Sequence, residues 1–195
     1  MITVCACGGI MNKTSVADKK ANTKKSLGAF WSAVAVFLLC AVLGWIWEEI
    51  YCLIKHGFWV ERGFLIGPYL PIYGIGGLLI YMLKGHMKKS PWVVFITSIG
   101  VAGGVEYLGS FVLELVYDKR WWDYSGRFLN LNGRVHFFGL LFFGLAGCFA
   151  AYFVLPTYLR FLGKMNRRTV ITVGTVLLSI FFSDAAISIL LQFVI

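Results

Sequence analysis

Acidic residues are scarce in this chain: Asp and Glu number 9 against 18 Lys and Arg, and all charged residues make up only 14% of the sequence. Hydrophobic residues make up 59% and aromatic residues 17%, which is well above the averages of soluble domains. This composition excludes an ordinary soluble domain. It indicates a membrane protein with a formal net charge of +9.

The sequence also lacks the motifs of familiar enzymes and a cysteine framework. It contains no GxSxG, no HExxH, no GxxxxGKS/T and no Gly-rich phosphate loop after a strand. The pair Cys5 and Cys7 has no second pair at the spacing of metal ligands. We therefore expect no catalytic residue, no metal, no cofactor and no nucleic-acid partner. ATP hydrolysis would need a separate ATPase.

Long uncharged runs predict five transmembrane helices, because about 20 apolar residues span a bilayer. The expected fold is all-α and polytopic, with spans at about 27–52, 63–83, 90–117, 135–159 and 169–195. Residues 1–26 carry five lysines and are predicted to form a disordered cytoplasmic tail. No repeat and no second domain are indicated.

The beginning of the second span does not favour a regular helix. Residues 63–77 contain two prolines and five glycines, which disfavour helix. Irregular backbone at membrane depth is tolerated where it is buried in protein or lines a cavity. We predict an irregular wall there, with Gly67, Pro68, Pro71 and Gly74 as its structural residues.

The distribution of Lys and Arg predicts the orientation. The tail and alternate connections carry 12 of these residues, whereas the remaining segments carry 6. Since cytoplasmic segments are richer in Lys and Arg, the N-terminus is predicted to be cytoplasmic and the C-terminus external. The broken part of the second span then lies in the outer half of the membrane.

Five of the nine acids fall inside or at the edge of the predicted spans, where they are costly and usually functional. Glu106 and Asp184 come 16 and 15 residues after the inner edges of their spans, which is roughly 23 Å into a core of about 30 Å. Glu48 and Glu49 lie near the outer boundary. Glu114 follows Glu106 by eight residues, so Glu106, Ser110 and Glu114 form a stripe on one helical face.

The predicted outer loops supply possible partners for these acids. Arg62, Arg120 and Arg134 could serve as counter-ions or anion contacts, and Asp123, Asn130 and Asn132 lie near them in sequence. We therefore expect an outward-facing carboxylate and arginine site, with Glu106 and Asp184 as proton or cation carriers. Structural ion pairing without transport is the competing interpretation, above all for Glu48, Glu49 and Asp123.

A resemblance to a known family rests on five stretches: WE at 47–48, RGFLIGPYLPIYG at 62–74, EY at 106–107, RWWDYS at 120–125 and NLNGR at 130–134. Across residues 40–150 the chain resembles the bacterial family called Putative ABC-transporter type IV membrane proteins. The resemblance implies a multi-pass permease of the bacterial plasma membrane, working with a separate ATPase. Five spans are few for one translocation path, so a homodimer or a partner membrane subunit is expected.

Two other classes of function remain open. An intramembrane enzyme acting on lipid or envelope intermediates could use Glu48, Glu106 and Asp123 as acid and base groups. A non-catalytic assembly or regulatory membrane protein would use the outer loops to contact partners. The permease-like transport subunit is the preferred interpretation, on the resemblance and the placement of the acids.

Overall fold

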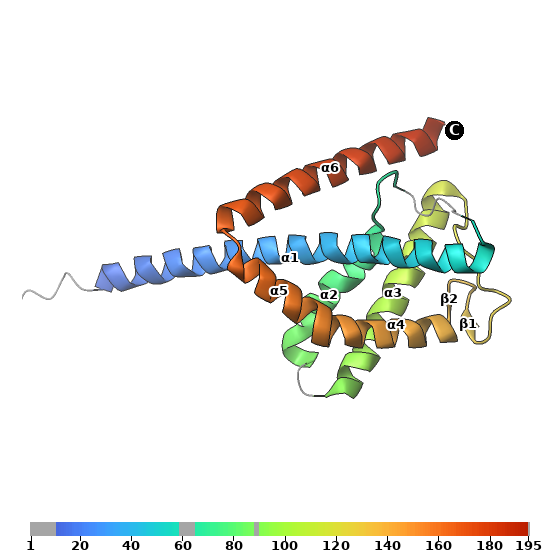
Figure 1. The fold of residues 1–195 in the computed structure, drawn as a ribbon, viewed down its shortest axis with the longest axis horizontal. Helices are drawn as coiled ribbons and strands as arrows, with labels where there is room; N and C mark the ends of the chain where they lie inside the picture. The colour runs from blue at the N-terminus through green and yellow to red at the C-terminus, as the bar shows by residue number, and fades with distance from the viewer. Residues whose placement is uncertain (1–10, 59–64, 88–89, 195) are drawn as a thin grey trace, which may run out of the picture.

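Helices account for almost all the regular structure in the computed structural model, which describes residues 11–58, 65–87 and 90–194 (Figure 1). The helices are α1 (Met11–His56), α2 (Pro71–Met87), α3 (Pro91–Tyr117), α4 (Phe137–Phe149), the π-helix η1 (Ala150–Val154), α5 (Leu155–Lys164) and α6 (Arg167–Val194). One antiparallel hairpin, β1 (Asn130–Leu131) and β2 (Val135–His136), lies between α3 and α4.

Four helical stretches are long and apolar enough to cross a membrane: Gly28–His56, Pro91–Tyr117, Phe137–Lys164 and Arg167–Leu191. A fifth, Pro71–Leu83, is apolar but shorter. The prediction of an all-α polytopic membrane fold is confirmed. Helix α1 also includes residues 11–26 of the predicted tail, residues 1–10 lie outside the described part of the chain, and the location of the tail stays a prediction.

The second span is broken at its beginning, as its prolines and glycines predict. Residues 65–70 are irregular, and α2 starts only at Pro71, where a missing N–H costs no helical hydrogen bond. The irregular segment is held against α1, because the backbone N–H of Leu70 donates to the carbonyl of Ala41 at 3.0 Å. At 17 residues, α2 is about 25 Å long.

The helices pack mainly in two pairs, α1 with α2 and α3 with α4. Glycines allow the close approach: a β-carbon at Gly77 would collide with Cys40, and one at Gly147 would collide with Ser98. In contrast, a β-carbon at Gly100 or Gly104 would meet open space. Gly100 and Gly104 are therefore not used for close packing within the described chain.

The span from Phe137 to Lys164 changes helix type near its middle. Pro156 has no N–H to donate to the carbonyl of Tyr152, so the α-helical hydrogen-bond pattern is interrupted there. The chain forms the π-helical turn η1 just before this proline and then continues as α5.

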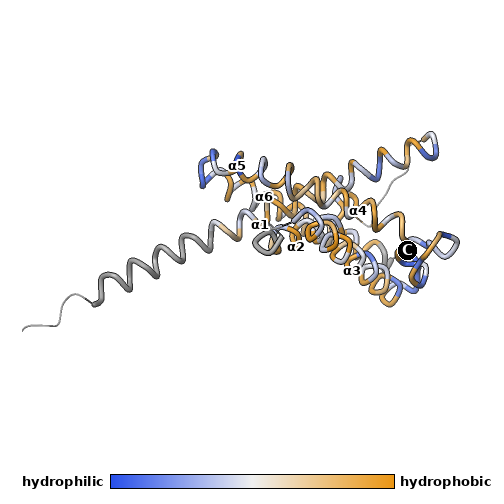
Figure 2. The backbone as a smooth tube through the Cα atoms, turned by 90° about the horizontal axis from the view of Figure 1, so that it is seen from below, coloured by the Kyte–Doolittle hydropathy of each residue, from blue (hydrophilic) through white to orange (hydrophobic). Residues whose placement is uncertain are grey.

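The polar residues gather at two ends of the helical assembly. The end of α1, the end of α3, the hairpin and the C-terminal end of α6 lie toward the right in Figure 1, whereas the α5–α6 turn lies at the left. Figure 2 shows hydrophobic residues along the helices and hydrophilic residues at the end of α5. This arrangement places the connections predicted to be external at one end.

Candidate functional site

The polar residues predicted to form one site are divided among three places in the structure. A loop network contains Glu114, Arg120, Asp123 and Arg134. A carboxyl pair, Glu48 of α1 and Glu106 of α3, lies near Tyr73 of α2. Asp184 binds the irregular segment before α2. The acidic side chains at the three places have different bonding partners, so each place is suited to different chemistry.

The loop network ties the 118–136 connection to α3. Glu114 forms an ion pair with Nη2 of Arg134 at 2.6 Å and another with Nη2 of Arg120 at 3.2 Å. Arg134 is buried, and its Nη1 donates to Ser110 Oγ at 3.0 Å. Its guanidinium also lies over the rings of Tyr107 and Phe111. Arg134 therefore serves as the internal anchor of the connection.

The hairpin of this connection is built by its asparagines. Asn130 donates from Nδ2 to the carbonyls of Ser125 and Arg127, and its Oδ1 accepts from the N–H of Gly133. Asn132 has a φ of 53° and donates from Nδ2 to the hydroxyl of Tyr107 at 2.9 Å. These two predicted binding residues thus fold the loop and attach it to α3.

The exposed members of the loop network are held in their charged forms. Hydrogen bonds from the hydroxyl and N–H of Ser125 keep the pKa of Asp123 below its usual value. The hydrogen bond and charge of Glu114 raise the pKa of Arg120. Because each of its charged side chains is paired with one of opposite sign, the loop network serves to hold the connection against the ends of the helices.

The carboxyl pair has no such cationic partner among the described residues. Tyr73 of α2 donates its hydroxyl to Glu48 Oε1 at 2.6 Å. Glu106 is buried and is hydrogen-bonded to Tyr124 of the loop, and it lies near enough to Glu48 for their charges to interact. None of the ion pairs formed within residues 28–58, 65–83 and 90–191 includes either carboxyl.

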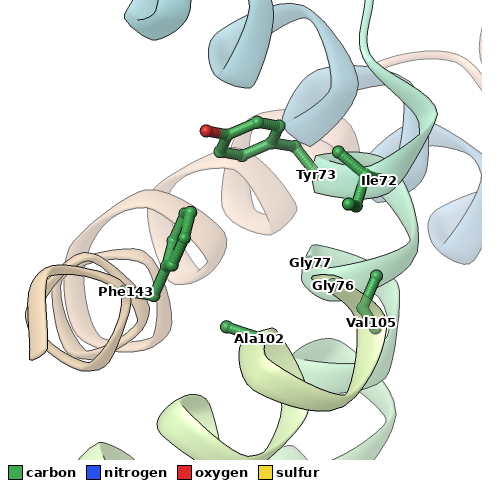
Figure 3. A pocket seen from close by; sticks show the side chains of 7 residues that line it. All are labelled: Ile72, Tyr73, Gly76, Gly77, Ala102, Val105 and Phe143. Carbon is green, nitrogen blue, oxygen red and sulfur yellow. The ribbon is translucent and has the colours of Figure 1, made fainter. Parts of the chain in front are cut away.

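A small cavity lies among α2, α3 and α4 (Figure 3). Its volume is about 90 Å³. Tyr73, which binds Glu48, forms part of its wall, and Val105 precedes Glu106 in sequence. The other lining residues are Ile72, Gly76, Gly77, Ala102 and Phe143. A volume of this size is far below the 300–1,000 Å³ typical of pockets for organic ligands.

Gly44 of α1 makes room for the ring of Tyr73. A β-carbon at Gly44 would collide with the Tyr73 side chain, whose Cδ2 would be 2.6 Å away. We expect Gly44→Ala to destabilise the protein by about 1–3 kcal/mol through overpacking and to displace Tyr73 from Glu48. Thermal unfolding in detergent, followed by tryptophan fluorescence, measures the loss. Gly104→Ala is the matched control, since its methyl group meets open space; an equal loss there would contradict the account.

Asp184 of α6 lies away from the carboxyl pair and binds the irregular wall. Its carboxylate accepts hydrogen bonds from the N–H of Ile66 at 3.3 Å and of Gly67 at 2.9 Å, and from the hydroxyl of Tyr69 at 2.6 Å. Ser188, one turn further along α6, donates to it at 3.2 Å. Asp184 therefore caps this segment, because it binds backbone N–H groups that form no helical hydrogen bonds.

Neutralising Asp184 is expected to loosen the irregular wall. Asp184→Asn offers one acceptor oxygen and adds an N–H donor, so the donors at Ile66 and Gly67 lose charged acceptors. Hydrogen bonds to charged groups contribute about 1.5–3 kcal/mol. Amide exchange over residues 65–70 should therefore accelerate by about ten- to a hundredfold, measured by mass spectrometry. Ser188→Ala removes one hydrogen bond outside the wall and should change this exchange little; unchanged exchange in Asp184→Asn would exclude the capping role.

Two predicted residues do not join these groups. Glu49 is buried at 4% exposure, and its Oε2 has no hydrogen-bond partner among the described residues. Arg62, one of the expected counter-ions of the acids, lies outside the described residues. Of the residues predicted for the irregular wall, Gly67 lies in the irregular segment, where a β-carbon would collide with Tyr69. Pro71 and Gly74 belong instead to helix α2, because a proline is tolerated at the first helical position. A β-carbon at Gly74 would come within 2.7 Å of Phe37.

The hydroxyl partners of the acids were not among the predicted site residues. Tyr69, Tyr73 and Tyr124 each bind a carboxylate. Tyr73 and Tyr124 belong to the motif stretches PIYG and RWWDYS, which was the available signal. The ring of His136 lies 4.4 Å from that of Tyr124, which places a histidine next to the group that binds Glu106.

The apolar helices and their connections define a multi-pass membrane protein. A family model described as "Putative ABC-transporter type IV" matches residues 35–189, and the chain belongs to this family. The matched segment contains the loop network, the carboxyl pair and Asp184. No curated protein and no solved structure matches the chain. The family and the helices together support a membrane protein related to transport.

Proposed function

We propose that the chain is a permease-like transport subunit in which the carboxyl pair, Glu48 and Glu106, takes up and releases a proton. The observations that carry the proposal are the 2.6 Å hydrogen bond from Tyr73 to Glu48 and the position of Glu106 near enough for its charge to act on both residues. Neither carboxyl has a cationic partner among the described residues. Two neighbouring carboxylates repel each other, and each is costly inside a membrane. When the pair binds one proton, both the repulsion between the carboxylates and the cost of charge inside the membrane become smaller.

The size and the ligands of the site favour a proton over a larger cargo. The cavity of about 90 Å³ that Tyr73 lines is too small for an organic solute. Among the described residues, no group of three or more His, Cys, Asp and Glu side chains could hold a metal ion. The hydrogen-bonding groups at the carboxyls are two tyrosine hydroxyls, which can exchange or orient a proton.

The surrounding elements fit a site that opens toward one side of the membrane. The paired charges of the loop network lie in the connection that also supplies Tyr124 to Glu106. Under the predicted orientation this connection is external, so protons would enter from outside. A homodimer, a partner membrane subunit or a separate ATPase would complete the translocation path and supply the energy.

The test is proton flux through the purified full-length protein in liposomes. An imposed pH gradient should decay faster in liposomes with the protein than in empty liposomes, as reported by an entrapped pH-sensitive dye. Flux should not depend on whether Na⁺ or K⁺ is the accompanying cation. If the gradient decays at the rate of empty liposomes, or only when one of these metal cations is present, the proposal of a proton carrier is wrong.

A further inference from the structure

A second and larger cavity lies at the opposite end of the molecule, beside the turn between α5 and α6. Its volume is about 280 Å³. Most of its wall is apolar and comes from three helices, with Trp31 of α1, Leu159 and Leu162 of α5, and Val170 and Ile171 of α6. Ser32 also lines it, but its hydroxyl donates to the carbonyl of Gly28. The interior therefore suits hydrocarbon.

One basic residue lines this cavity, and three others are close to it in sequence. Arg167, the first residue of α6, lines it directly, and Arg160, Lys164 and Arg168 are exposed nearby in the same connection. Residues 155–168 contain no Asp or Glu, and these four residues take part in none of the ion pairs within the described chain. Figure 2 shows the hydrophilic end of α5 next to the apolar part of the same helix. The rim is complementary to an anion.

We infer that this cavity binds an anionic phospholipid, with one acyl chain inside it and the phosphate at Arg167. A free phosphate would leave the apolar wall unfilled, whereas a zwitterionic lipid such as phosphatidylcholine would bring its own ammonium group next to the basic residues. The volume of about 280 Å³ is enough for part of one chain and not for a whole lipid. Arginine suits this position because its planar guanidinium can contact two phosphate oxygens.

Two glycines keep the cavity open. Gly28 of α1 and Gly163 of α5 both line it, and a β-carbon at either position would meet no atom within 4 Å. Larger side chains can therefore enter the space without displacing the helices. This provides a way to fill the cavity while leaving the arginines in place.

The inference does not depend on the proposed proton carrier, and lipid binding tests it directly. The full-length protein in detergent is titrated with phosphatidylglycerol, phosphatidylcholine and glycerol 3-phosphate, and bound lipid is measured by native mass spectrometry. We expect phosphatidylglycerol to bind more tightly than phosphatidylcholine, and glycerol 3-phosphate not to bind. Arg167→Gln should weaken phosphatidylglycerol binding by about fivefold, which corresponds to one basic residue at a membrane surface.

Matched variants separate this site from general attraction between charges. Arg160→Gln removes the same charge from the same connection outside the cavity wall and should weaken binding less than Arg167→Gln. Gly163→Leu should abolish binding by filling the cavity, and Gly28→Leu gives a second route if the first variant does not fold. Gly100→Leu, which also extends into open space, should bind like the wild type. Equal effects of the two arginine variants, or full binding by both cavity-filling variants, would overturn the inference.

Discussion

Glu106→Gln is expected to abolish proton flux through the protein in liposomes. Glutamine keeps the size of the side chain and can still bond to Tyr124, but it cannot release and regain a proton. Glu106 is buried near Glu48 with no cation from the described residues, and the two carboxyls hold the proton jointly, so the loss of either ionisable group should stop the exchange.

Two further variants define the specificity of this effect. Glu48→Gln should reduce flux to a similar degree, because the pair holds the proton jointly. Glu114→Gln removes a carboxyl from the same helix two turns away, within the loop network, and should leave flux close to the wild-type rate when protein yield is matched. If Glu106→Gln transports at the wild-type rate, or if Glu114→Gln is equally inactive, the carboxyl pair is not the carrier.

Arg134→Met is expected to cause the largest loss of stability among the loop residues. The substitution removes the hydrogen bond to Ser110, the ion pair with Glu114 and the contacts with two aromatic rings. A hydrogen bond to a charged group contributes about 1.5–3 kcal/mol, so the midpoint of thermal unfolding should fall by about 5–10 °C for a chain of this length. Tryptophan fluorescence reports the change, since Trp122 donates to the carbonyl of Arg134.

The shape of the guanidinium should matter as much as its charge. Arg134→Lys keeps a positive charge but cannot contact Ser110 and Glu114 at once from a planar group, so it should restore only part of the lost stability. Arg120→Met removes a half-exposed partner of Glu114 and should have a smaller effect. A full rescue by lysine, or an equal loss in Arg120→Met, would show that Arg134 is not the anchor.

The membrane fold could be predicted from sequence because hydropathy and helix length are properties of each segment alone. The break before α2 could also be predicted, since Pro68 and Pro71 restrict the backbone and Gly67 disfavours helix wherever they occur. The relative rotation of the helices is different. It depends on contacts between distant segments, such as Gly44 under Tyr73 and Gly77 against Cys40.

The relative rotation of the helices decides which acidic side chains lie near one another. Glu106 and Asp184 were assigned to the same depth by residue counting, and on that basis to one site. In the structure Glu106 faces Glu48 and Tyr124, whereas Asp184 binds Gly67 and its neighbours. Depth along a helix is set by the sequence, but the direction in which a side chain points across the membrane is set by packing.

The sequence predicts the type of partner that each arginine has, but not which residue it is. Acids and arginines near one another in sequence indicated ion pairs, and Arg134 with Glu114 is such a pair. The hairpin that brings Arg134 back to α3 depends on left-handed residues such as Asn132 and Gly133, whose effect on the path of the chain is three-dimensional. The tyrosines that bind carboxylates also have aromatic roles in membrane proteins, so their position alone did not reveal them.

The central claim is that the carboxyl pair holds an exchangeable proton, and infrared difference spectroscopy measures this most directly. Spectra of the full-length protein in liposomes, recorded as the pH is changed, should contain the C=O band of a protonated carboxylic acid that appears and disappears reversibly. The account predicts that this band is lost in both Glu48→Gln and Glu106→Gln and retained in Glu114→Gln. A wild-type spectrum without the band, or a band unchanged in the first two variants, would contradict the account.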